Sequence, residues 1–148
     1  PVWPMPSARE CLAMLRERGF LLGMVSNAQF FTPILFEALW GDSAEAFGFD
    51  PDLQYYSYQF GRGKPSLTMF DAAAESLRKR GVAADEVVFV GNDMLNDVVP
   101  ARGVGFRAAL FAGDSRSLRL REEDPRVAGV VPDLVLTDLE QLSRCMSK

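Results

Sequence analysis

The sequence predicts an α/β protein in which one parallel sheet is covered by helices on both faces. Two observations support this. Short apolar runs such as residues 20–25 and 87–90 have the composition of strands buried on both faces, and they alternate along the chain with segments that have helical periodicity. Strand–helix alternation requires right-handed crossovers between parallel strands. The 148 residues, 48% of them hydrophobic, are enough for one domain (1–148) with a real core.

The first helix and strand are predicted from the residues at their ends. Ser7 and Glu10 have the spacing of a capping box, which begins a helix. Gly19 is a typical residue for ending that helix. Residues 20–25 then form a buried strand, because nearly all of them are apolar.

The middle of the chain is predicted with the same signals. A helix covers residues 32–40, where a proline occupies the first turn, and residues 41–54 have no clear period. Residues 55–58 are a short strand. Residues 66–80 form a helix that ends at Gly81.

The third strand, residues 87–90, is followed by a helix over about residues 94–102. Pro100 should kink or shorten that helix. The remaining elements are a strand at 106–111, an irregular segment at 113–132, a strand at 134–136 and a helix from Asp138.

Composition excludes several classes of function. The formal net charge of -4 argues against a nucleic-acid surface, and the absence of histidine excludes Ser-His-Asp triads and His-ligated zinc. Cys11 and Cys145 are too few for a disulfide framework, which indicates a reducing compartment. No apolar run reaches the roughly 18 to 20 residues of a membrane span. We therefore expect a cytoplasmic protein with a small ligand, without nucleic-acid or membrane partners.

Polar residues follow three of the predicted strands. Because the carboxyl ends of parallel strands share one edge of a sheet, we expect these residues to lie close together. A hydroxyl with adjacent backbone N–H groups can hold a phosphoryl oxygen, a lysine can neutralise negative charge, and paired carboxylates suit Mg²⁺. The pattern therefore predicts a phosphate site with a metal. Its residues are Ser26, Asn27, Lys64, Asn92, Asp93 and Asp97.

Each of these signals also has a purely structural interpretation. Asp93 can cap the following helix while Asp97 faces solvent. Ser26 and Asn27 can form an ordinary turn, and Lys64 can be solvated. Only their order and spacing along the chain make the functional interpretation specific.

The segment GRGKPS is not a phosphate-binding loop of nucleotide hydrolases. Tyr58 stands where that loop needs its first glycine, and Pro65 replaces the Ser or Thr after the lysine. Pro65 instead suits the first turn of a helix from Ser66, which would direct Lys64 towards an anion.

Arg116, Arg119 and Arg121 form a local basic cluster in the irregular segment. They can contact an anionic substrate at the same sheet edge. Alternatively, because residues 122–124 are acidic, they can form a solvated and self-paired surface.

Three motifs occur in a familiar order: VSNAQ at 25–29, GKPS at 63–66 and VGNDMLNDV at 90–98. They resemble the second, third and fourth motifs of the haloacid dehalogenase-like (HAD) hydrolase superfamily, and the tail VPDLVLTDLEQL resembles its last strand and helix. This resemblance covers nearly the whole chain. It implies a three-layer, Rossmann-like fold.

The resemblance also implies roles for the polar residues. Ser26, with Asn27 beside it, would bind the phosphoryl group, and Lys64 would stabilise the anionic nucleophile and intermediate. Asp93 with Asp97 would hold Mg²⁺. The register of the last motif leaves Asn92 as an alternative ligand, although a carboxylate binds Mg²⁺ more strongly than an amide oxygen.

The family's nucleophilic DxDxT motif is missing from the chain. The only Asp-x-Asp, at residues 50–52, is interpreted as a loop in which Pro51 shapes a turn. We therefore expect the C-terminal part of a HAD-like core, without the cap domain and the central first strand. Strands 20–25 and 87–90 should then flank an empty slot or pair directly, and the isolated fragment should be marginally stable.

The expected activity is a Mg²⁺-dependent phosphatase that hydrolyses a small phosphorylated metabolite through an aspartyl-phosphate. Its nucleophile would be supplied by upstream sequence, so this fragment alone should be inactive. One alternative is a 2-haloacid dehalogenase-type hydrolase, which needs no metal. Another is a non-catalytic HAD-like or receiver-like phosphate-binding module.

Overall fold

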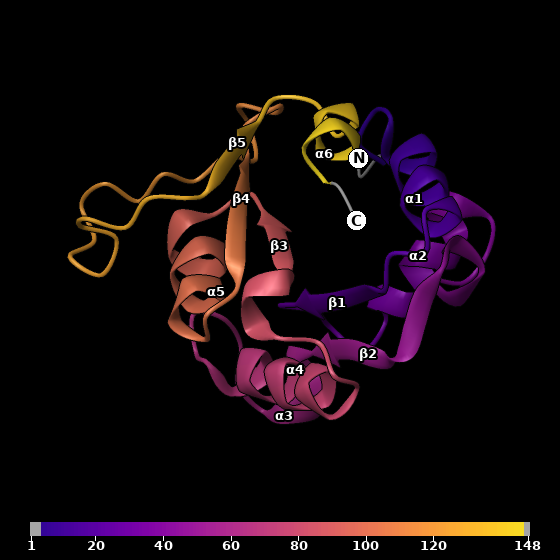
Figure 1. Cartoon of the computed structure of the whole chain (residues 1–148), viewed down its shortest axis with the longest axis horizontal. Coiled ribbons are helices and arrows are strands. Elements are labelled where there is room, and N and C mark those ends of the chain that lie inside the picture. Colours follow the sequence, from indigo (N-terminus) through magenta and orange to yellow (C-terminus); the bar gives the residue numbers. More distant parts are fainter. Residues whose placement is uncertain (1–3, 147–148) are drawn as a thin grey trace.

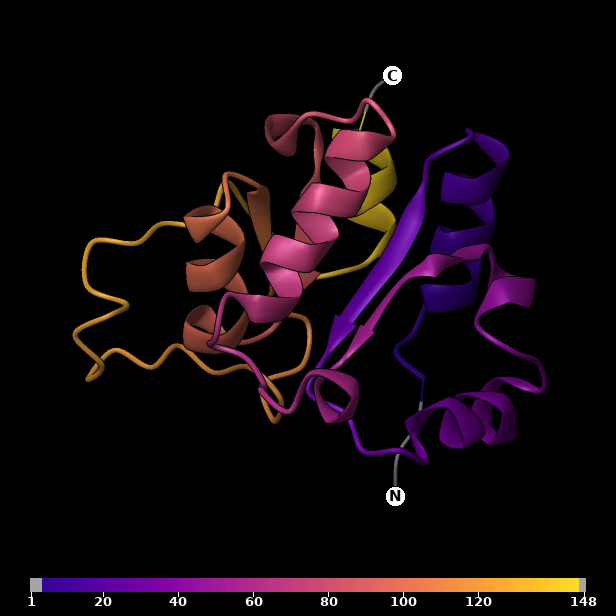
Figure 2. The same ribbon diagram turned by 90° about the horizontal axis from the view of Figure 1, so that it is seen from below.

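The computed structural model describes residues 4–146 and places its strands in two parallel sheets (Figure 1). In the first sheet β1 pairs with β2, which runs beside it (Figure 2), and in the second the order is β3-β4-β5. The strands are β1 (Leu22–Ser26), β2 (Phe49–Tyr56), β3 (Val88–Gly91), β4 (Arg107–Phe111) and β5 (Leu134–Leu136).

Helices connect these strands, as the alternating pattern predicts. Short turns complete the connections, including a π-helical turn, η3, directly after β3. The helices are α1 (Ala8–Glu17), α2 (Thr32–Trp40), α3 (Ser57–Phe60), α4 (Thr68–Lys79), α5 (Val99–Gly103) and α6 (Glu140–Cys145). The turns are η1 (Glu45–Phe47), η2 (Ala84–Glu86) and η3 (Met94–Val98).

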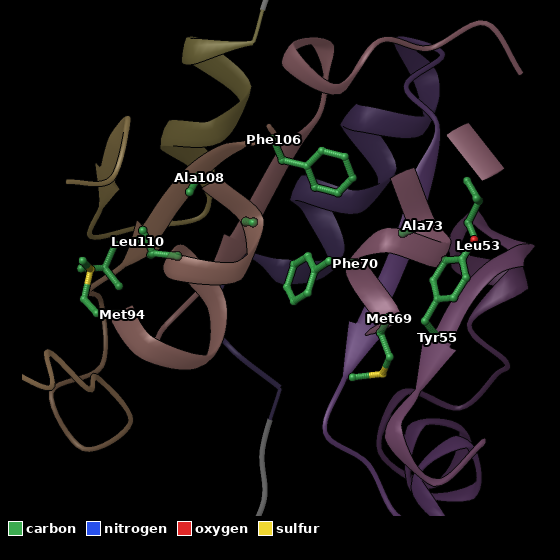
Figure 3. Packing of buried hydrophobic residues seen from close by; sticks show 11 residues of the cluster. Leu53, Tyr55, Met69, Phe70, Ala73, Met94, Phe106, Ala108 and Leu110 are labelled. Atoms are coloured by element: carbon green, nitrogen blue, oxygen red, sulfur yellow. The ribbon is translucent and has the colours of Figure 1, made fainter. Parts of the chain in front are cut away.

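The alternation of side chains along β4 produces the three layers. Ala108 and Leu110 pack into a cluster with residues of α4 and α5, whereas Ala109 packs into a second cluster with residues of α1 and α6. Helices therefore cover both faces of the strands, which confirms the predicted fold class. Figure 3 shows Met69 and Phe70 of α4 between residues of β2 on one side and residues around β4 on the other.

A slot separates the two sheets. The strand neighbour of β1 is β2 and that of β3 is β4, so the facing edges of β1 and β3 are not paired with each other. A cavity of about 730 Å³ lies there, lined by Leu22–Val25 of β1 and Val87–Val90 around β3. Residues of α4 line it on one face and residues of α1 and α6 on the other. Of the two expected arrangements, the structure has the slot and not the direct pair.

The second strand differs from its prediction. β2 begins at Phe49, and residues 57 and 58, expected to finish the strand, lie in the helix α3. Asp50 and Asp52 lie within β2, where Arg80 donates to Asp50 at 2.6 Å and to Asp52 at 3.3 Å. The loop interpretation of residues 50–52 was wrong because β2 is an edge strand, which tolerates Pro51.

Two helix starts also differ. Ser7 precedes α1 with a φ of 60° and makes no side-chain capping hydrogen bond, so the predicted capping box is wrong. α4 begins at Thr68, two residues later than expected, because residues 64–67 form a turn before the helix starts. None of the helices within residues 4–146 is long and apolar enough to cross a membrane.

Candidate active site

Lys64 and Asp97 form a buried ion pair at the carboxyl ends of β1 and β3. Lys64 Nζ lies 2.5 Å from Asp97 Oδ1, and the two side chains are only 12% and 5% exposed. Lys64 Nζ also donates to the carbonyl oxygen of Val25 in β1 at 3.3 Å. The pair therefore lies across the end of the slot, and the interpretation of Lys64 as a solvated residue was wrong.

Asn27 holds the backbone of Lys64 in place. Its Oδ1 accepts from Lys64 N at 2.6 Å, and its Nδ2 donates to Lys64 O at 3.1 Å. A side chain at Gly63 would collide with the Asn27 amide, which explains the glycine. Ser26 precedes Asn27 as the last, half-buried residue of β1. The ligand-binding roles of Ser26 and Asn27 stay predictions.

Asp97 is held by the turn that follows β3. Its Oδ2 accepts from the backbone N–H groups of Asn92 and Asp93, both at 3.0 Å. Its carboxylate occupies the space where a side chain at Gly91 would lie. Asp97 is 4% exposed, so the solvent-facing alternative was wrong.

Asp93 caps the π-helical turn. Its Oδ1 accepts from Leu95 N at 3.0 Å and from Asn96 N at 3.1 Å, and its Oδ2 accepts from Asn96 Nδ2 at 2.9 Å. The capping alternative for Asp93 is thus correct. Burial raises the pKa of this carboxyl, but hydrogen bonds from Arg121 and the backbone outweigh burial and hold the pKa below its ordinary value.

Arg121 belongs to the site through an ion pair with Asp93, a partner that the sequence did not predict. Its Nη2 lies 2.8 Å from Asp93 Oδ2, and its Nε lies 3.3 Å from the same oxygen. Asp93 also raises the pKa of the Arg121 guanidinium. Arg121 has a φ of 56°, a left-handed conformation that costs a non-glycine residue roughly 1 to 2 kcal/mol. The ion pair helps to offset that cost.

The segment before Arg121 is bound to the turn through its backbone. Met94 N donates to Arg119 O and Arg119 N donates to Asn92 O, both at 2.9 Å, and Asn92 Nδ2 donates to Ser117 O at 2.7 Å. The side chain of Arg119 donates only to the nearby carbonyl oxygens of Arg116 and Leu118, and Arg116 pairs with Asp114 at 3.3 Å. The self-paired surface interpretation therefore holds for these two arginines but not for Arg121.

As arranged, these residues do not fit a divalent metal ion. Each carboxylate oxygen of Asp93 and Asp97 already accepts at least one hydrogen bond, and two protein cations neutralise the pair of acids. Within residues 4–146 there is no group of three or more acidic, Cys or His side chains that could hold a metal. The amide oxygen of Asn92 accepts no hydrogen bond from the described part of the chain. The metal-binding roles of Asn92, Asp93 and Asp97 stay predictions.

The fold and this cluster define a class of hydrolase. A family model described as HAD-hydrolase-like matches residues 61–142, more than half of the chain. The chain belongs to this family. No curated protein matches its sequence.

Solved structures share the fold. A HAD phosphatase from Thermococcus onnurineus aligns with a TM-score of 0.69 at 22% identity over 95% of this chain and 57% of its own. A 2-haloacid dehalogenase from Pseudomonas syringae pv. Tomato DC3000 aligns with a TM-score of 0.65 at 25% identity. The alignment covers 95% of this chain and 51% of the dehalogenase. The putative HAD-hydrolase YfnB from Bacillus subtilis, described as bound to magnesium, aligns with a TM-score of 0.75 at 19% identity. The alignment covers 97% of this chain and 56% of YfnB. The chain thus spans a little over half the length of these proteins.

Proposed function

We propose that the chain supplies the lysine-bearing part of the active site of a phosphatase that hydrolyses a small phosphomonoester through an aspartyl-phosphate. The observation that carries this proposal is the buried pair of Lys64 and Asp97 at the end of the slot. A lysine ammonium held this way supplies fixed positive charge at a water-poor site, where charge stabilisation is most effective. The Mg²⁺ dependence expected from the sequence is part of the proposal only for the longer protein, because in this chain Lys64 and Arg121 already pair with Asp97 and Asp93.

The nucleophile in this proposal is a carboxylate at the end of a strand seated in the slot. β1 and β3 both run parallel to their partners, and Lys64 connects their carboxyl ends. A strand inserted in the same direction would end beside Lys64. Its carboxylate oxygen would attack phosphorus, the bond from phosphorus to the alkyl oxygen would break, and the leaving alkoxide would take a proton from water. A second water would then attack the aspartyl-phosphate and release phosphate and the carboxylate.

The residues of this chain have separate tasks in that reaction. Lys64 neutralises charge on the nucleophile and on the phosphoryl oxygens. The Ser26 hydroxyl, at the end of β1, orients a phosphoryl oxygen. Asn27 keeps the Lys64 backbone in place through its two hydrogen bonds. Asp97 holds the ammonium in position.

The activity test compares this chain with a protein that also contains the upstream sequence. Phosphomonoester hydrolysis is measured for both, with Mg²⁺ and with a chelator. We expect turnover by the longer protein in Mg²⁺ and none by this chain alone. Turnover by this chain alone, or a longer protein without phosphatase activity, would contradict the proposal.

A peptide should restore the missing strand. We expect a peptide of five β-branched apolar residues followed by Asp to bind in the slot, because each unpaired strand edge offers backbone donors and acceptors. Binding should change the fluorescence of Trp40, which lines the cavity, and slow amide exchange in β1 and β3. The same peptide with proline at its third and fifth positions, which removes two N–H donors, is the control. Equal binding of both peptides would rule out strand insertion.

A second candidate is a dehalogenase-type hydrolase without a metal. The specific observation in its favour is that Arg121 and Lys64 already neutralise Asp93 and Asp97. Halide release from a 2-haloacid by the longer protein in the presence of a chelator would support this candidate over the phosphatase.

A further inference from the structure

We propose that Arg121 is an internal cation that competes with a divalent metal ion for the carboxylate of Asp93. A metal would then bind only when the Arg121 side chain leaves Asp93. The inference concerns this one carboxylate, and it does not depend on which substrate the protein hydrolyses.

The first argument is the geometry at Asp93. The guanidinium of Arg121 contacts the carboxylate with two nitrogens, Nη2 at 2.8 Å and Nε at 3.3 Å from Oδ2. The other three donors to Asp93 come from Leu95 and Asn96, which belong to the turn itself. Arg121 is therefore the only partner from outside the turn among the described residues.

The second argument is electrostatic. The Asp93 side chain is 10% exposed, so its charge is poorly screened by water and needs a nearby cation. Lys64 is engaged by Asp97, which leaves Arg121 as the cation that neutralises Asp93. A guanidinium and Mg²⁺ repel each other when both lie close to the same carboxylate, so Arg121 at Asp93 weakens the binding of the metal.

The third argument is that Arg121 can leave while its neighbours stay. The backbone hydrogen bonds that tie the segment to the turn involve Ser117 and Arg119, not Arg121. The Arg121 side chain is 38% exposed, so it can turn into water without opening the core. Release of the side chain therefore requires only local movement around its left-handed backbone.

The test measures Mg²⁺ binding by calorimetry for the chain and its variants. Arg121→Gln should bind Mg²⁺ more tightly by at least about tenfold, the factor expected when a competing charge-assisted hydrogen bond is removed. Arg121→Lys keeps the charge and should lie between Arg121→Gln and wild type. Arg119→Gln is the matched control, since Arg119 donates only to nearby carbonyl oxygens, and should bind like wild type.

A second readout follows Arg121 itself. The ¹⁵Nε–¹Hε signal of Arg121 should shift and exchange faster with water as Mg²⁺ is added to wild type, because the guanidinium leaves Asp93. Thermal unfolding of each variant without metal verifies that it is folded. Equal Mg²⁺ affinity in wild type and Arg121→Gln, or Mg²⁺ binding that leaves the Arg121 signal unchanged, would overturn the proposal.

Discussion

Replacing Lys64 by methionine is expected to lower the turnover of the assembled enzyme by at least about a hundredfold, the scale for losing one electrostatic stabiliser. Methionine keeps most of the length of the side chain but removes the charge. The same change leaves the buried Asp97 without its cation, so we also expect the free energy of unfolding to fall by about 3 kcal/mol.

The two effects of the Lys64 change can be separated. Asp97→Asn combined with Lys64→Met removes the unpaired buried charge, so the double variant should recover part of the stability but none of the turnover. Arg62→Met is the matched control: it removes a cation from the same loop, but an exposed one, and should change neither quantity appreciably. Wild-type turnover in Lys64→Met would show that the lysine has no catalytic role.

Replacing Gly91 by alanine is expected to destabilise the protein by at least about 2 kcal/mol, the range for forcing extra atoms into a packed site. The added Cβ would overlap the carboxylate of Asp97, which cannot move without breaking its bonds to Lys64 and to the turn after β3. Gly91 does not have a positive φ, so the backbone itself would accept alanine. The cost therefore comes from Asp97. Chemical denaturation measures it.

A second background tests this cause. In an Asp97→Gly protein both the carboxylate and the Cβ that would meet the new side chain are gone, so Gly91→Ala should cost much less there than in wild type. Gly103→Ala is the matched control, because its Cβ would meet only the flexible end of Leu67. An equal cost of Gly91→Ala in both backgrounds would show that Asp97 is not the obstacle.

The sequence by itself determined the arrangement of the fold and the position of the lysine. Strand–helix alternation predicts the parallel sheets with helices on both faces, because buried parallel strands need long crossovers. The apolar runs that precede Asn27 and Asn92 correctly predict β1 and β3. The expectation that their carboxyl ends meet at one edge agrees with the contact of Lys64 with both Val25 and Asp97.

Local pattern was a poor guide where distant residues provide the partners. Residues 50–52 read as a turn because aspartate and proline favour turns, yet they lie in β2, at a register shift between residues that pair with β1, and Asp50 and Asp52 form ion pairs with Arg80. Tyr58 has the apolar, aromatic character of a strand residue, but it lies in α3. Secondary-structure propensity is weak compared with such tertiary contacts.

Only the tertiary structure decided which cation each acid meets. Asp93 and Asp97 are four residues apart, so spacing alone predicts one shared site, yet Asp97 meets Lys64 while Asp93 meets Arg121, 28 residues further along the chain. The slot between β1 and β3 is likewise a property of the packed sheets, because it is enclosed by residues of α4, α1 and α6 that come together only in the folded chain. The physical reason is the same in both cases: charge pairing and strand spacing depend on distances in space, which the order of residues along a chain does not contain.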